Sequence, residues 1–235
     1  MESFKLPASD SQMKNKKAEG TMENKSAKEL LWEGKRKEIE GYADALGYGI
    51  DDKIKESLVA LNIFGLPTTA SCEGHINHGI SAPWIEISAP DEPEERFAGE
   101  KEIYQKIANK YGVPLEDVKT GDNHMAWVEA EIERSKADET KEYKNWREEN
   151  KKLMAKAEGF LNEFYKNRKA SNDNRLEITK EGEGNFRIHN GGRDYKNAPK
   201  DISEKQKQEL SKRLFNHQKE MEEFSSFLKE KYLKS

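Results

Sequence analysis

The sequence has only one cysteine, Cys72, in 235 residues, and no apolar run that approaches the ~18 residues of a membrane span. A single cysteine excludes an intrachain disulfide and is compatible with a reducing compartment. The first residues, Met-Glu-Ser-Phe-Lys, lack the charged-then-apolar pattern of a secretory signal. We therefore expect a cytoplasmic protein that does not cross a membrane.

Apolar side chains are also scarce, whereas charged ones are abundant. They make up 34% and 37% of the chain, against about 45–50% and about 25% in typical globular domains. The core must therefore be modest and the surface highly charged. The formal net charge is −4, and the two signs alternate along the chain, so no overall field favours nucleic acid or an anionic membrane.

Composition divides the chain into a tail and one folded region. Residues 1–25 are rich in Lys, Ser, Asn and Glu, so we predict that they are disordered. Residues 26–235 are predicted to form a single α+β domain. Within it, 26–88 contain two helices and a hairpin, 89–122 a linker with short helices, and 123–235 a long helix, a second hairpin and a C-terminal helix.

The predicted fold is a small, mainly antiparallel sheet made of two hairpins, with helices packed on it. The first hairpin joins strands at 68–72 and 84–87, and the second spans 175–189 around a Glu-Gly-Glu-Gly turn. The C-terminal helix, from Ser203 to about Tyr232, carries an apolar stripe that matches a stripe near the end of the long helix. These stripes predict a long C-terminal helical pair.

Between Glu133 and Lys152, the long helix predicted over residues 123–168 is almost entirely charged or polar, apart from Tyr143 and Trp146. One interpretation is a solvated helix that is held by ion pairs four residues apart. The other is an arm that uses these two exposed aromatic residues to bind a protein partner or a second copy of the chain. Both interpretations stay open.

Chemically distinctive residues gather between the two strands of the first hairpin. Cys72 ends the first strand, and Gly74 permits a tight turn directly after it. Two of the five histidines, His75 and His78, follow that turn. We therefore expect Cys72, Glu73, His75 and His78 to meet at one end of the sheet.

Three interpretations of this group compete. The spacing Cys-x2-His-x2-His makes Cys72, His75 and His78 a candidate zinc site with an open fourth position, in which Glu73 or Glu86 would be the general base. Alternatively, Cys72 is a nucleophile whose pKa a nearby histidine lowers, with Glu73 or Glu86 orienting that histidine. In the third interpretation Cys72 is a small buried hydrophobe and the histidines are ordinary loop residues.

Two other places carry weaker signals. A Gly-Gly-Arg segment ending at Arg193 lies beside His189, where backbone amides and a guanidinium could bind an anion, although such a segment is often only a turn. His217 lies within the apolar stripe of the C-terminal helix. A histidine at such a position is usually a hydrogen-bonded core residue and less often a ligand.

The string Ser-Cys-Glu-Gly-His at 71–75 follows Gly-x-Pro-Thr-Thr and precedes a Pro-aromatic-x-Glu-Ile strand. This pattern resembles a family of short, uncharacterised bacterial proteins with a Ser-Cys-Glu-Gly-His segment, over residues 51–87 and more loosely from Phe160 onward. The family has no assigned activity, so the resemblance implies a shared fold and site. A fainter similarity is to the wybutosine-synthesising tRNA-modification proteins, whose strand ends in Ser-Cys-Ser-Gly-Arg, where this chain has Glu73 and His75.

Two hypotheses on function follow. The first is a ligand- or metal-binding domain centred on Cys72, His75 and His78, with a zinc-dependent hydrolase as its catalytic version. The alternative is a non-catalytic interaction or accessory protein that uses the charged helical arm. The metal content of protein purified without a histidine tag distinguishes between them.

Overall fold

The computed structural model describes residues 26–43, 47, 49–182, 184–199 and 201–235, so the predicted disordered tail at 1–25 lies outside the described residues. Within them the chain forms seven helices and four strands. The helices are α1 (Ala27–Glu40), α2 (Lys55–Ile63), α3 (Glu100–Tyr111), α4 (Leu115–Thr120), α5 (His124–Arg134), α6 (Lys141–Tyr165) and α7 (Glu204–Lys234). The strands are β1 (Thr68–Cys72), β2 (Trp84–Ile87), β3 (Leu176–Glu181) and β4 (Asn185–Asn190). None of the described helices is long and apolar enough to cross a membrane.

The four strands form one antiparallel sheet in the order β1-β2-β4-β3. At one end of the sheet Cys72 pairs with Trp84, which in turn pairs with His189. At the other end Ile87 pairs with Phe186, next to the turn of the second hairpin. The predicted α+β class, with a sheet built from two hairpins, is confirmed.

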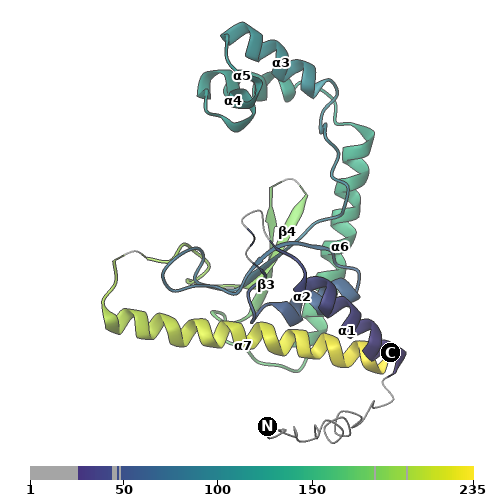
Figure 1. Ribbon diagram of the computed structural model, residues 1–235, viewed down its shortest axis with the longest axis vertical. Coiled ribbons are helices and arrows are strands. Elements are labelled where there is room, and N and C mark those ends of the chain that lie inside the picture. Colours follow the sequence, from purple (N-terminus) through teal and green to yellow (C-terminus); the bar gives the residue numbers. More distant parts are fainter. Residues whose placement is uncertain (1–25, 44–46, 48, 183, 200) are drawn as a thin grey trace, which may run out of the picture.

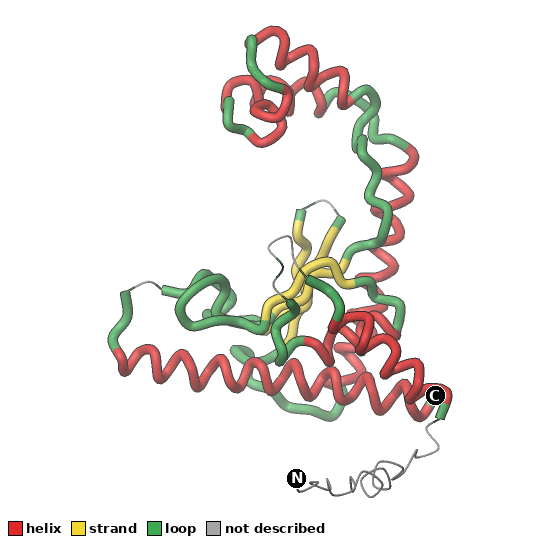
Figure 2. The backbone as a smooth tube through the Cα atoms, viewed as in Figure 1, coloured by secondary structure: helices red, strands yellow, loops and turns green. Residues whose placement is uncertain are grey.

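One face of this sheet forms the main core. Side chains alternate between the faces of a strand, and Ile85, Ile87, Phe186 and Ile188 are all at most 1% exposed. They belong to the same buried cluster as residues of α1, α2, α6 and α7. Figure 2 shows α1, α2 and α7 gathered on one side of the strands. This packing fixes the end of β1 relative to α2 and α7, where the candidate site lies.

A second, smaller core lies within α3, α4 and α5. Its buried side chains are Tyr104, Ile107, Ala108, Val118, Ala126 and Ala130. These three short helices project beyond the far end of α6, away from the sheet (Figure 1). The region that was expected to be a linker with short helices is thus joined by α5 into a small helical bundle.

The continuous helix predicted over residues 123–168 is wrong, because α5 ends at Arg134 and α6 begins at Lys141. The side chain of Thr140 accepts a hydrogen bond from the N–H of Tyr143, which caps the first turn of α6. Directly before this cap, Glu139 pairs with Phe97 in an isolated antiparallel bridge. A capping residue and a backbone bridge therefore interrupt a run whose composition favours a helix.

The expected exposure of Tyr143 and Trp146 is also wrong. Tyr143 is 0% and Trp146 is 6% exposed, and their rings stack with centroids 5.8 Å apart. The indole N–H of Trp146 donates to the carbonyl of Ala89 at 3.0 Å. The segment after β2 and the second hairpin cover this part of α6. The residues of the helix alone do not indicate this burial, because the covering segments are distant in the sequence.

The two long helices touch through aromatic side chains, as the matching stripes predicted. The rings of Phe164 on α6 and Phe224 on α7 lie 5.3 Å apart in an edge-on arrangement. Figure 1 shows α7 crossing α6 rather than running beside it. Other residues of the α7 stripe, such as Met221 and Leu228, are buried in the cluster that includes α2. The apolar stripe of α7 therefore packs against both α6 and α2.

Candidate metal centre

Three possible metal ligands meet where β1 ends. Cys72 is the last residue of β1, Asp51 lies shortly before α2, and His75 follows the turn after β1. One ligand atom of each lies within 4.8 Å of the others, and all three residues are half-buried. Nε2 of His75 is 3.7 Å from Oδ2 of Asp51. A thiol, an imidazole and a carboxylate at these separations could hold a metal ion.

The tight turn that brings His75 back toward Cys72 depends on Gly74. Its φ of +82° lies in the left-handed region that favours glycine. A Cβ atom at this position would lie 2.7 Å from Cδ1 of Leu214 and 2.8 Å from the carbonyl carbon of Ala82. The turn is therefore pressed against α7, and the N–H of His75 continues it by donating to the carbonyl of Ile80.

Backbone amides orient two of the three candidate ligands. The N–H of Gly74 donates to Sγ of Cys72 at 3.3 Å, and the N–H of Glu73 donates to Oδ2 of Asp51 at 3.1 Å. The side chain of Gln218 on α7 holds the carbonyl of Glu73 at 3.0 Å. Hydrogen bonds of this kind orient ligand atoms in metal sites, so these amides position Sγ of Cys72 and the carboxylate of Asp51.

The electrostatic environment distinguishes between the uses proposed for Cys72. Burial raises the pKa of its thiol, and the negative charges of Asp51 and Glu73 raise it further, against the opposing effect of the Gly74 hydrogen bond. A reactive cysteine needs a lowered pKa, so this setting does not favour a free nucleophile. The same negative charges attract a cation, and a bound metal ion deprotonates a coordinating thiol.

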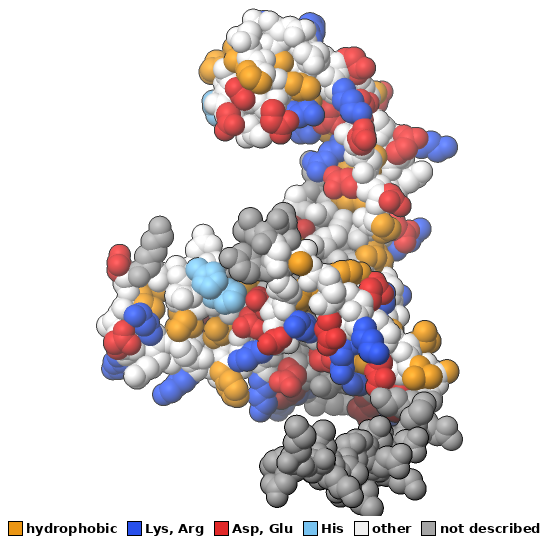
Figure 3. Space-filling view, viewed as in Figure 1, with side chains coloured by type: hydrophobic (Ala, Val, Ile, Leu, Met, Phe, Trp, Pro, Cys, Tyr) orange, Lys and Arg blue, Asp and Glu red, His pale blue; other side chains and the backbone are white. Residues whose placement is uncertain are grey.

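His78 occupies a different place from the one expected in the Cys-x2-His-x2-His set. Its ring stacks on that of His75, with centroids 4.1 Å apart, and its Nδ1 lies 2.7 Å from Oδ1 of Asn77. It is not one of the three residues whose ligand atoms converge. Figure 3 shows histidine side chains forming an exposed patch beside the loops at this end of the molecule.

The two candidate bases lie at unequal distances from the cluster. Glu73 is adjacent to Cys72, and one of its carboxylate oxygens accepts the N–H of Lys53 at 3.1 Å. Glu86 lies within β2 and forms an ion pair with Arg187 of the neighbouring strand at 2.8 Å. The guanidinium of Arg187 also covers the ring of Trp84. Glu86 is therefore engaged within the sheet, whereas Glu73 lies beside the candidate ligands.

A cleft of about 500 Å³ reaches the cluster from the open edge of the sheet. Its described walls include Asp51, Leu58 of α2 and the β1 residues Thr68 to Ser71. β1 is an edge strand, so among the described residues the cleft lies at the edge of the sheet and meets the cluster at Asp51.

The sequence-based search missed Asp51 as a ligand. An aspartate just before a helix often caps its first turn, yet α2 is not capped by a side chain and begins later, at Lys55. Asp51 instead turns its carboxylate toward the amide of Glu73. The tandem acidic residues before α2, which leads directly into β1, were the one available signal that an acid could return to the end of that strand.

The remaining histidines of interest have structural partners. His217 is 1% exposed, and its Nε2 lies 3.2 Å from the buried carboxylate of Asp194. Arg213 binds the same carboxylate with two nitrogens, so hydrogen bonds from Arg213 and His217 outweigh the effect of burial and lower the pKa of Asp194. His189 stacks on Tyr195 with ring centroids 3.6 Å apart. Arg193 is exposed and adds nothing to these contacts.

Because Tyr143 and Trp146 are buried, they are not available to a partner of the predicted arm. The first part of the predicted arm, α5, has exposed apolar side chains. Met125 and Ile132 on α5 are 64% and 52% exposed. Binding of a protein partner or self-association through this region therefore stays a prediction.

No family model, no curated protein and no solved structure matches this chain. The resemblance to the Ser-Cys-Glu-Gly-His family accordingly also stays a prediction.

Proposed function

We propose that this protein binds one divalent transition-metal ion, zinc by preference, through Asp51, Cys72 and His75. The observation that carries the proposal is the convergence of three different ligand types from separate segments, with all ligand atoms within 4.8 Å. Thiolate, imidazole and carboxylate are the ligands that zinc uses in proteins. Preformed amide hydrogen bonds to Sγ and to the carboxylate support the proposal.

Three protein ligands leave a fourth position for water or substrate, which is the arrangement of catalytic rather than closed structural zinc sites. A bound zinc ion lowers the pKa of a water ligand and so supplies a nucleophile at neutral pH. Glu73 adjoins Cys72 in the chain and is the candidate to accept the proton. The cleft beside Asp51 supplies the space for a substrate. The catalytic version of the proposal is therefore metal-assisted hydrolysis.

The test of the metal site is a zinc titration of tag-free protein against a competing chromophoric chelator. The wild type should bind one equivalent. Asp51→Ala, Cys72→Ser and His75→Ala should each weaken binding by more than about 100-fold, because removing even an outer-shell partner costs about 10–100-fold. The matched controls are His78→Ala and Glu86→Gln, which should change affinity by less than about tenfold on the same scale.

Two results would contradict this assignment. A wild type that binds no zinc removes the metal site altogether. If His78→Ala is as damaging as His75→Ala while Asp51→Ala is harmless, the ligands are those of the Cys-x2-His-x2-His spacing. The hydrolytic step is tested separately with an activated ester: Glu73→Gln should keep zinc and lose turnover, and full turnover in that variant would exclude Glu73 as the base.

A further inference from the structure

A second cleft, of about 460 Å³, lies between α6 and the hairpin of β3 and β4. Its volume is in the range of small-molecule sites, about 300–1,000 Å³. The cleft is at the opposite end of the sheet from Cys72, because Asn185 adjoins Phe186, which pairs with Ile87. It is therefore separate from the candidate metal centre.

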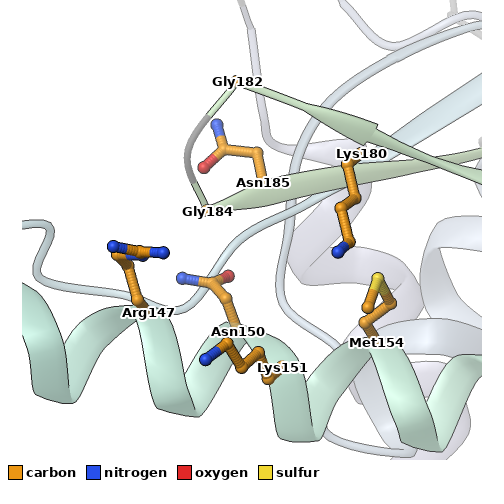
Figure 4. Close-up of a pocket in the computed structure, with 8 residues that line it drawn as sticks. All are labelled: Arg147, Asn150, Lys151, Met154, Lys180, Gly182, Gly184 and Asn185. Atoms are coloured by element: carbon orange, nitrogen blue, oxygen red, sulfur yellow. The ribbon is translucent and has the colours of Figure 1, made fainter.

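Among the described residues that line this cleft, the charged side chains are all cationic. Arg147 and Lys151 reach it from α6 and Lys180 from β3, and the described residues that line it include no acidic side chain. This is unusual in a chain with a formal net charge of −4. Figure 4 shows Lys180 extending from its strand toward α6.

The two lysines of this cleft have charge available to a ligand, whereas Arg147 already has a carboxylate partner. Lys180 has no carboxylate partner among the described residues. Lys151 pairs with Glu148, but both side chains are more than half exposed, and such pairs contribute little. Arg147 pairs with Glu139 in front of α6. Guanidinium and ammonium groups together suit a phosphate, whose oxygens accept several charge-assisted hydrogen bonds.

Two amide side chains complete the polar lining. Asn150 is only 2% exposed, and its Oδ1 accepts the N–H of Ala89 at 2.7 Å. Its Nδ2 donates one hydrogen to the carbonyl of Trp146, which leaves a second N–H for another acceptor, since an amide nitrogen has two. Figure 4 shows Asn150 directed from α6 toward the hairpin that carries Asn185.

The wall formed by the hairpin is set by a close contact. A Cβ atom at Gly184 would overlap the ring of Trp146, which is itself fixed by its hydrogen bond to Ala89. The absence of a side chain at 184 thus lets the hairpin approach α6, and Lys180 extends from the hairpin toward Met154 of α6 (Figure 4). The two sides of the cleft are held in place before any ligand enters.

From these observations we propose that the cleft binds the phosphate group of a small phosphorylated molecule. Lys180, Lys151 and Arg147 supply the positive charge, and the amides of Asn150 and Asn185 donate or accept at its polar substituents. The ligand class is a phosphate or diphosphate ester, since the described part of the lining offers cations and amides and a single large apolar side chain, Met154.

The test uses inorganic pyrophosphate as the probe, with calorimetry on the full chain in metal-free buffer containing EDTA. The wild type should bind about one equivalent. Lys180→Gln and Lys151→Gln should each weaken binding about tenfold or more, because each removes a hydrogen bond to a charged group. Lys152→Gln is the matched control: it removes the same charge from the next position of α6, whose side chain does not line the cleft.

Selective loss in the two cleft variants, with Lys152→Gln unchanged, supports the site. Equal losses in all three variants would show that pyrophosphate responds only to general charge and would overturn it. Failure of the wild type to bind in the millimolar range would also overturn it. Because Lys180, Lys151 and Lys152 are all exposed, unchanged circular dichroism is expected, and the Cys72→Ser variant should bind pyrophosphate normally.

Discussion

The two ends of the sheet differ in charge and in chemistry. At the Cys72 end, Asp51 and Glu73 surround a thiol and an imidazole. At the end that carries the second hairpin, three cations and two amides line a cleft. One end suits a metal cation and the other an anion, although the signs alternate along the chain and nearly cancel in total. The fold therefore places acidic groups at one end of the sheet and cationic groups at the other, although the two signs alternate in the sequence.

The two ends are also fixed by different means. A left-handed glycine pressed against α7 holds the turn beside Cys72. At the other end, the buried indole ring of Trp146 packs against Gly184 of the second hairpin. These supports can be removed one at a time, and each removal should affect its own end of the sheet.

The largest effect on stability is expected at the end of the sheet that carries the second hairpin. Trp146→Ala should lower the free energy of unfolding by about 3–5 kcal/mol, as usual for a large buried aromatic residue. The control is Phe215→Ala on α7, which is 61% exposed and should change stability by less than about 0.5 kcal/mol. Urea denaturation measures both. Comparable losses in the two variants would mean that Trp146 is not part of the core.

A smaller effect is expected at the metal end. Gly74→Ala should cost about 1–3 kcal/mol more than Gly79→Ala, the range for overfilling a packed site. Both glycines have positive φ, so an alanine at either position would have the same kind of backbone strain. Only Gly74 has neighbours within 3 Å of the added methyl group, whereas the nearest atom to Gly79 is 4.0 Å away. Equal costs by chemical denaturation would show that the turn is not pressed against α7.

The smallest effect is a pH dependence that only the metal end should show. Burial raises the pKa of Cys72. Below that pKa the thiol of the free protein is protonated, and zinc must displace this proton to bind the sulfur. Zinc affinity should therefore rise with pH, by about tenfold per unit for this one proton. In Cys72→Asp, whose carboxylate is already ionised, the slope should be shallower by that amount. Chelator competition at a series of pH values measures it, and parallel slopes would contradict thiolate ligation.

Much of the fold follows from local patterns in the sequence. The two strands of the first hairpin, at 68–72 and 84–87, were predicted with the bounds that the structure has. The residues between them include Gly74 and Pro83, which favour turns and mark the ends of the strands. The break before α6 was missed because the residues around it are polar helix formers, and its cause is the bridge between Glu139 and a distant strand-like segment at Phe97.

The candidate site was only partly predictable for the same reason. Spacing alone brought Cys72, His75 and His78 together, since they are neighbours in the sequence. In the structure Asp51, and not His78, completes the cluster with Cys72 and His75, because α2 packs beside the sheet, which no local pattern contains. The cleft at the other end was not predicted at all, because it combines α6 with a hairpin and requires the burial of Trp146 by segments far from it in the chain.

The most direct test of the metal assignment is X-ray absorption at the zinc edge of the zinc-loaded protein. We expect one sulfur ligand at about 2.3 Å and nitrogen or oxygen ligands at about 2.0–2.2 Å, with the sulfur lost in Cys72→Ser. The imidazole contribution should disappear in His75→Ala and persist in His78→Ala. A shell without sulfur, or one whose imidazole signal depends on His78 instead, would contradict the assignment of Asp51, Cys72 and His75 as the ligands.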